Sequence, residues 1–156
     1  MQWSAVLLPD LANNLASDPV LADAEAGQTF RGTSGDDSVV GTAGDDTLYG
    51  LLGNDTLDGG DGNDTIRGGE GDDFLSGGAG DDLISDGPVI GIDRTGADTA
   101  YGGAGDDRIT SNIAYGEAGN DTLNGTISSL LDGGAGDDLI YGFSGDSGND
   151  TLAGGD

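Results

Sequence analysis

Apolar side chains recur along most of this chain every nine residues, and the positions between them are largely polar or glycine. Six consecutive nonapeptides run from Gly32 to Ser85, and each has an aliphatic residue in its eighth position. Three residues of which only the middle one is apolar predict a short β-strand that buries one side chain. Five further copies follow Ser85 at irregular spacing. The expected core residues are Val39, Leu48, Leu57, Ile66, Leu75, Ile84, Ala100, Ile109, Ala114, Leu123, Leu131, Ile140 and Leu152.

The residues between these strands predict tight turns. The fourth position of the nonapeptide is Gly and the sixth is Asp in all eleven copies. Glycines in the first, second and fourth positions permit positive φ and a close approach of neighbouring backbones. Two turns and two strands close one coil, and successive coils stack as parallel strands ~4.8 Å apart. The pattern therefore predicts an all-β solenoid rather than the disordered chain that composition alone would suggest.

The composition narrows the possible chemistry. The 156 residues include 30 acidic and four basic ones, a formal net charge of −26, and there is no His or Cys. This excludes Ser-His-Asp and Cys-His catalysis, disulfides, and imidazole or thiolate metal sites. We expect no nucleic-acid partner, because the charge is repulsive, and no membrane insertion, because no apolar run approaches ~18 residues. The remaining obvious partner is a cation.

The turn pattern resembles the GGxGxDxUx nonapeptides of repeats-in-toxin (hemolysin-type) calcium-binding proteins, from Gly32 to Asp156. The resemblance implies a right-handed parallel β-roll that is secreted, extracellular or at the cell surface. It also implies that each Ca²⁺ lies between turns two nonapeptides apart, held by sixth-position carboxylates and by backbone carbonyls of positions one to four. That donor set suits a cation that takes six to eight oxygens. The calcium ligands expected on this basis are Asp37, Asp46, Asp55, Asp64, Asp73, Asp82, Asp98, Asp107, Asp121 and Asp138.

Successive turns of such a roll alternate between its two edges, so the aspartates form two rows. The first row begins with Asp37 and Asp55, and the second with Asp46 and Asp64. The spacing breaks four times after the sixth copy, and counting half-coils places all four breaks in the first row. Neighbouring aspartates then give three sites in the first row and five in the second, about eight Ca²⁺ ions. The few core side chains cannot offset the cost of ordering the chain, so we expect folding to require calcium.

The two ends differ from the repeats. Residues 1–30 contain one glycine and are richer in Ala and Leu. Asp18 before Pro19 has the pattern of a helix start and Gly27 that of a helix end, which predicts a helical cap; a partner-binding or targeting segment is the alternative. The expected domains are this cap, 1–30, and the calcium-binding β-roll, 31–156. No cleavable signal is expected, and the chain stops inside a repeat, which suggests a fragment or an end that stacks on another subunit.

Two other sets of residues leave alternatives open. The fifth position is Asp or Asn in ten of the eleven copies, and we expect it to stabilise surface turns rather than bind metal. Tyr49, Tyr101, Tyr115 and Tyr141 fall at outward ninth positions. They form either a partner-binding patch or ordinary strand surface.

We expect no catalytic activity, because the carboxylates already serve turns and calcium, and enzymes of this family carry a separate catalytic domain. Ice-binding versions of the repeat have a Thr-x-Asn ladder that is missing here. Two roles remain. One is a calcium-folded structural or secretion-associated module, and the other is a self-assembling subunit of a surface layer, filament or adhesin joined through open solenoid ends.

Overall fold

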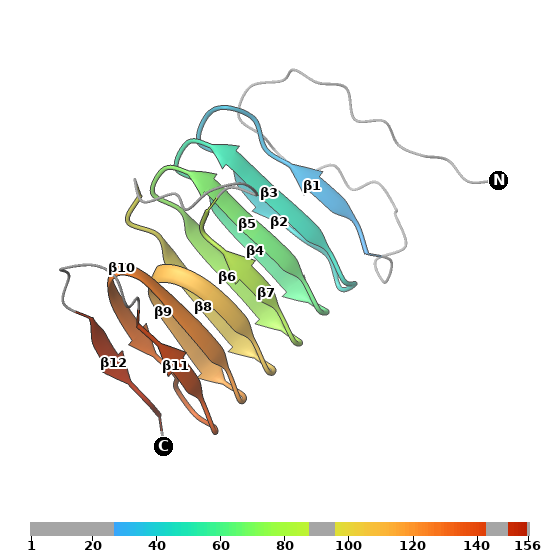
Figure 1. Ribbon diagram of the computed structural model, residues 1–156. Coiled ribbons are helices and arrows are strands. Elements are labelled where there is room, and N and C mark those ends of the chain that lie inside the picture. Colours follow the sequence, from blue (N-terminus) through green and yellow to red (C-terminus); the bar gives the residue numbers. More distant parts are fainter. Residues whose placement is uncertain (1–26, 88–95, 143–149, 156) are drawn as a thin grey trace.

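The computed structural model describes residues 27–87, 96–142 and 150–155, and every regular element in them is a β-strand. The strands wind into a parallel β-solenoid of about six turns (Figure 1), which confirms the all-β class. Within these residues there is no helix of the length and hydrophobicity that crossing a membrane requires. The strands are β1 (Thr29–Arg31), β2 (Ser38–Val40), β3 (Thr47–Leu52), β4 (Thr56–Asp61), β5 (Thr65–Glu70), β6 (Phe74–Ala79), β7 (Leu83–Ser85), β8 (Thr99–Ala104), β9 (Arg108–Ala118), β10 (Thr122–Asp132), β11 (Leu139–Tyr141) and β12 (Thr151–Ala153).

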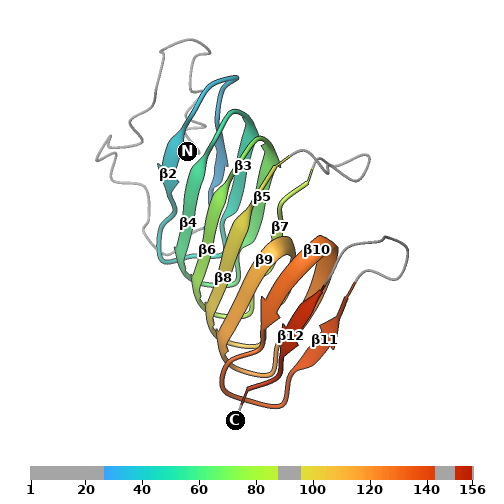
Figure 2. The ribbon, with the colours of Figure 1, turned by 90° about the vertical axis from the view of Figure 1, so that its left-hand side faces the viewer.

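The coil has two strand faces joined by two rows of turns. Face A is the outer surface of β1, β3, β5, β7 and β11, together with the first halves of β9 and β10. Face B is the outer surface of β2, β4, β6, β8 and β12, together with the second halves of β9 and β10. Figure 2 shows β2, β4, β6 and β8 of face B side by side. First-row turns lead from face A to face B, and second-row turns lead back.

Strand register explains the spacing of the repeats. Thr47 of β3 pairs with Thr65 of β5, so regular neighbours on one face are 18 residues apart. All four breaks in the spacing lie in first-row connections, as expected: between β7 and β8, within β9, within β10, and between β11 and β12. In β9 and β10 the strand itself crosses the first-row edge, and its two halves pair on different faces.

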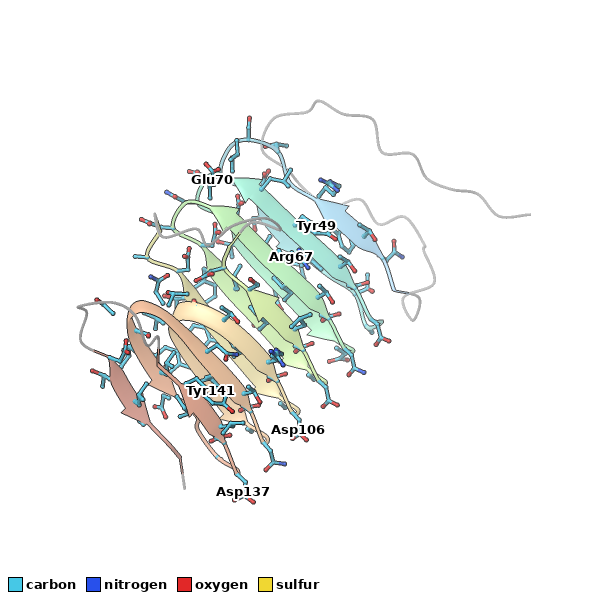
Figure 3. The ribbon with its side chains drawn as sticks, in the orientation of Figure 1. Tyr49, Arg67, Glu70, Asp106, Asp137 and Tyr141 are labelled. Atoms are coloured by element: carbon cyan, nitrogen blue, oxygen red, sulfur yellow. The ribbon has the colours of Figure 1, made fainter. Side chains whose placement is uncertain are left out.

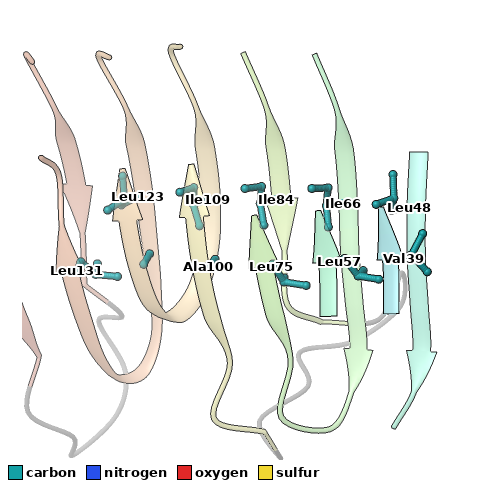
Figure 4. Packing of buried hydrophobic residues seen from close by; sticks show 11 residues of the cluster. Val39, Leu48, Leu57, Ile66, Leu75, Ile84, Ala100, Ile109, Leu123 and Leu131 are labelled. Atoms are coloured by element: carbon teal, nitrogen blue, oxygen red, sulfur yellow. The ribbon is translucent and has the colours of Figure 1, made fainter. Parts of the chain in front are cut away.

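A column of aliphatic side chains, made of two facing rows with one row from each strand face, runs through the centre of the solenoid (Figure 4). Eleven of the thirteen expected core residues are buried. Ile140 is only partly buried against the column, and Leu152 was wrongly expected inside, since it is 50% exposed. No described coil lies beyond β12 to cover Leu152. Phe30 packs against the other end of the column, although no glycine-aspartate turn marks its half-coil.

The solenoid includes residues that the sequence assigned to the cap. Thr29–Arg31 form β1 and pair with β3, and the Gln28 amide donates to Asp46 Oδ1 at 2.6 Å. The roll therefore extends at least two residues before the expected boundary at residue 31. The helix expected between Asp18 and Gly27 lies outside the described residues, and the division into domains stays a prediction.

The tyrosines lie on the outer faces. Tyr101 of β8 and Tyr115 of β9 are register partners on face B, and their rings stack at 4.9 Å between centroids. Phe74 of β6 extends this stack, 5.3 Å from Tyr101. Tyr49 and Tyr141 lie on face A.

Candidate metal sites in two rows of aspartates

Each turn ends in a sixth-position aspartate whose backbone and first carboxylate oxygen join successive coils. The Asp64 amide donates to Asp82 Oδ1 at 2.7 Å, and the Asp64 carbonyl accepts from the Leu83 amide at 2.8 Å. The same amide-to-Oδ1 bond links all eight neighbouring pairs that the sequence predicted, three in the first row and five in the second. Of the ten expected ligands, nine are buried and Asp138 is partly buried.

The second carboxylate oxygen is different, because in most turns it is buried without a hydrogen-bond partner. An ionised oxygen enclosed in this way is strongly disfavoured unless a cation or a proton compensates it. The same unsatisfied atom recurs coil after coil, which marks a feature of the repeat rather than a local defect. The atoms concerned are Oδ2 of Asp55, Asp64, Asp73, Asp82, Asp107, Asp121 and Asp138.

The pKa values of these carboxyls show the same imbalance. Burial raises the pKa of Asp73, Asp82 and Asp107 to about 7, and neighbouring aspartates of the row add to the effect. Burial also raises the pKa of the Asp55 and Asp64 carboxyls. Without a cation, these five carboxyls therefore hold their protons at a higher pH than exposed aspartates do.

First-position glycines leave room beside each open oxygen. A Cβ built on Gly77 would overlap Asp82 Oδ2 and would lie 2.5 Å from the carbonyl oxygen of Gly102 in the next coil. Both oxygens therefore border one small space that any side chain would fill. The same space exists at Gly50, Gly59, Gly102 and Gly116.

Glycines in the second and fourth positions bring further carbonyls into the turns. Gly78 and Gly80 have positive φ, and a Cβ on either would collide with the carbonyl of the corresponding glycine one coil earlier, Gly60 or Gly62. The turns of successive coils therefore stack closely, with carbonyl oxygens of one coil directed at the glycines of the next.

These donors fit calcium. Carboxylate and carbonyl oxygens in a flexible turn are the ligands of a hard cation, and neither imidazole nor thiolate is available. Among the described residues, no three acidic side chains gather around one point. Most ligands of a bound ion would therefore come from backbone carbonyls, with Oδ2 supplying the charge.

The first turn of each row departs from this arrangement. The Thr33 amide donates to Asp37 Oδ2 at 2.5 Å and its hydroxyl at 3.1 Å, and Thr42 does the same to Asp46 Oδ2 at 2.5 and 2.9 Å. In each turn whose sixth-position Oδ2 lacks a partner, the second-position residue has positive φ, whereas Thr33 and Thr42 do not. A β-branched residue strongly disfavours positive φ. Its peptide therefore points N–H at the carboxylate, and donors occupy the place of a cation. This closure was missed from the sequence.

The first row also changes after Asp98. The next turn of this row has no aspartate. The Asp98 carbonyl instead accepts hydrogen bonds from the Ile113 amide and the Ser111 hydroxyl. Further on, Ser129 donates to Asp150 Oδ1 through its amide and its hydroxyl, both at 2.9 Å. Asp150 therefore lies in the first row, where the count of half-coils placed the last break, and Ser129 takes the place of an aspartate in the coil before it.

Fifth-position side chains form a separate ladder at the surface. Asp81 Oδ1 accepts the Asp106 amide at 2.9 Å, and Asn63 Oδ1 accepts the Asp81 amide at 2.8 Å. Each of these side chains caps the backbone of the next coil and is exposed. Asp and Asn both serve here, because Oδ1 accepts the backbone bond in either residue; Asn120 in addition donates from Nδ2 to Asp106 Oδ1 at 3.1 Å.

A comparison with known protein families assigns the repeats. The profile of the RTX calcium-binding nonapeptide repeat matches residues 31–66, 58–85, 92–113, 111–127, 129–146 and 143–156, so the chain belongs to this family. No curated protein and no solved structure gave a significant match.

Proposed function

We propose that this chain is a calcium-binding β-roll that folds when it binds Ca²⁺ outside the cell and has a structural or secretion-associated role without catalysis. The observation that carries the proposal is the repeated Oδ2 atom, which is buried and without a hydrogen-bond partner in seven turns. A dication beside each such atom removes the cost of burying it and the repulsion between neighbours in the row.

The geometry supports about six ions rather than eight. Pairing each open Oδ2 with the next coil of its row leaves the sites 55/73 and 73/98 in the first row and 64/82, 82/107, 107/121 and 121/138 in the second. The sites 37/55 and 46/64 are closed by Thr33 and Thr42. Six ions would reduce the formal net charge from −26 to −14.

If folding depends on calcium, the chain has an unfolded state at low calcium and a folded roll at high calcium. In a low-calcium cytoplasm the uncompensated carboxylates favour the unfolded chain, and at the higher calcium level outside a cell the ions favour the roll by mass action. Such a switch suits a chain that is exported unfolded and must fold afterwards.

The test is a calcium titration of the metal-free chain, followed by far-UV circular dichroism, with bound calcium counted by equilibrium dialysis. We expect a cooperative coil-to-β transition with Ca²⁺, none with Mg²⁺, and about six ions per chain. A metal-free chain that is already folded and indifferent to calcium would overturn the proposal.

A second candidate is self-assembly through the last coil. Within the described residues, β11 and β12 each pair with β10 alone, and Leu139, Tyr141 and Leu152 around them are about half exposed. Sedimentation velocity at saturating calcium distinguishes the candidates: a monomer supports the first, and a length distribution of oligomers that Leu152→Asp abolishes supports the second.

A further inference from the structure

Face A differs in charge from the rest of the molecule. Its outward side chains are those at the seventh and ninth positions of the strands, and none of them is Asp or Glu. The acidic residues lie at the edges instead: in Figure 3, Glu70 lies at one edge and Asp106 and Asp137 at the other, while Tyr49 and Arg67 lie on the face between them. A chain with net charge −26 thus presents one broad surface without outward acids.

The described arginines are all on this face. Arg31 lies on β1, Arg67 on β5 and Arg108 on β9. In the part of the chain that the structure describes, none of the three guanidinium groups makes an ion pair or a hydrogen bond. With 30 acidic residues available, three unpaired arginines do not serve to neutralise the chain. Face B, in contrast, has Asp58 and Asp132 and no arginine at its outward positions.

The arginines are evenly spaced across the strands. The order β1-β3-β5-β7-β9 places one on every second strand, a step of about 10 Å across the sheet. Arg108, in the seventh position, is in register with Leu83 and through it with Thr65, two residues from Arg67, so these two arginines are about 12 Å apart. Arg31, Tyr49 and Arg67 are register partners in one line. The Arg31 guanidinium lies 5.1 Å from the centre of the Tyr49 ring, which helps to hold it in place.

This spacing favours a polyanion of low charge density. A guanidinium binds a carboxylate through two parallel hydrogen bonds, and an unpaired guanidinium is free to do so. Duplex nucleic acid carries a charge every ~1.7 Å, so most of its phosphates would find no arginine and would face the acidic edges. A disaccharide unit has about the length that separates two arginines here, and threonine hydroxyls beside them can bind sugar hydroxyls.

We propose that face A binds an acidic polysaccharide that carries about one carboxylate per disaccharide. Arg31, Arg67 and Arg108 bind successive carboxylates. Tyr49 lies between Arg31 and Arg67 and packs against the sugar that joins their carboxylates. The proposal goes beyond calcium binding and requires only that the roll is folded. The acidic edges exclude more densely charged polymers, since these would be repelled at both sides of the track.

The test uses a hyaluronan octasaccharide, in which carboxylated and neutral sugars alternate, and its carboxyl-reduced form as the neutral control. Isothermal titration calorimetry is carried out at saturating calcium, in 50 and 300 mM NaCl. We expect binding of the acidic oligosaccharide alone, weaker at high salt. Arg31→Gln, Arg67→Gln and Arg108→Gln together should weaken it at least tenfold. Asp58→Asn with Asp132→Asn on face B, the matched control, should change it less than twofold.

Three outcomes overturn the proposal: no binding by the wild-type roll, equal binding by the triple variant, or tighter binding of a short DNA duplex than of the octasaccharide. Circular dichroism and the calcium count of every variant show whether the roll has formed. A folded, calcium-loaded roll that does not bind the oligosaccharide therefore refutes this inference alone. A roll that does not form when calcium is added refutes the proposed function.

Discussion

The Asp64 amide donates a 2.7 Å hydrogen bond to Asp82 Oδ1, while Asp82 Oδ2 is buried and accepts no hydrogen bond. One oxygen of the carboxylate thus belongs to the backbone ladder, and the other faces carbonyl oxygens of the turns. Because its two oxygens differ in this way, the same residue sets the register of the coils through Oδ1 and carries the charge that would bind a cation on Oδ2.

Replacing Asp82 with Asn should separate these two tasks. The amide keeps an Oδ1 that accepts from Asp64, but it puts a neutral NH₂ group where Oδ2 faced the cation. Because Asp82 borders two sites, we expect the loss of one or two bound ions and a several-fold higher calcium midpoint in circular dichroism.

The matched control is Asp81→Asn in the adjacent fifth position. Asp81 uses only Oδ1, and Asn63 fills the equivalent place one coil earlier. Its calcium count and midpoint should stay those of the wild type. If the two variants behave alike, the sixth position has no special role in binding.

Filling the space beside the carboxylate should also remove an ion. Gly77→Ala changes no ligand and Gly77 does not have positive φ, yet its Cβ would overlap Asp82 Oδ2. We expect one ion fewer by equilibrium dialysis. Gly35→Ala is the control, because a Cβ there meets nothing within 4 Å. An unchanged ion count in Gly77→Ala would show that the metal lies elsewhere.

Opening the first turn of each row should add sites. Thr33→Gly with Thr42→Gly permits the positive φ seen in the other turns, removes the donors from Asp37 and Asp46, and should raise the count from about six ions to eight. Thr33→Val with Thr42→Val keeps the β-branched backbone and removes only the hydroxyls. This control should stay near six. A wild-type count of eight would contradict the closure directly.

The sequence was most informative where each coil repeats one task. A single inward residue per strand cannot be confused with its polar neighbours, so Leu48 or Ile84 is recognised from the period alone. Phe30 and Leu152 were misjudged at the two ends of the column: Phe30 follows no glycine-aspartate turn, and Leu152 has the right spacing but no described coil beyond it.

The two rows of aspartates were predictable in position, but the number of turns whose Oδ2 lacks a partner was not. The eight aspartate pairs follow from counting half-coils, because each half-coil contributes one strand even where it is longer or shorter than nine residues. Whether Thr33 closes a turn depends instead on the sign of one φ angle and on which way its N–H points. Leu51 shows the limit of a rule from residue type, since it occupies the same second position with φ 92°.

Acid should stabilise the metal-free roll and weaken its calcium binding. Burial raises the pKa of Asp73, Asp82 and Asp107 to about 7, whereas an unfolded chain titrates near 4. Between those values the folded state binds more protons, so its stability rises as pH falls from 7 towards 4 and is lost again above 7. Protons then compete with calcium for Oδ2.

The measurement is circular dichroism of chain freed of metal on a chelating resin, at pH 8 and pH 5 in 0.5 M KCl. The salt screens repulsion between exposed charges much more than that between buried ones. We expect more β-structure at pH 5 without calcium, and a higher calcium midpoint there than at pH 8. Loss of β-structure on acidification of the metal-free chain would contradict the assignment of these groups.

The core column should contribute to stability independently of the metal rows. Leu75 is fully buried, so Leu75→Ala leaves a cavity and should lower the free energy of unfolding by about 2–5 kcal/mol. Leu83, in the outward seventh position, is 43% exposed, and Leu83→Ala should cost about 0.5 kcal/mol or less. Urea titrations at saturating calcium give both values. Equal effects, or a changed ion count in Leu75→Ala, would show that the column and the turns do not act separately.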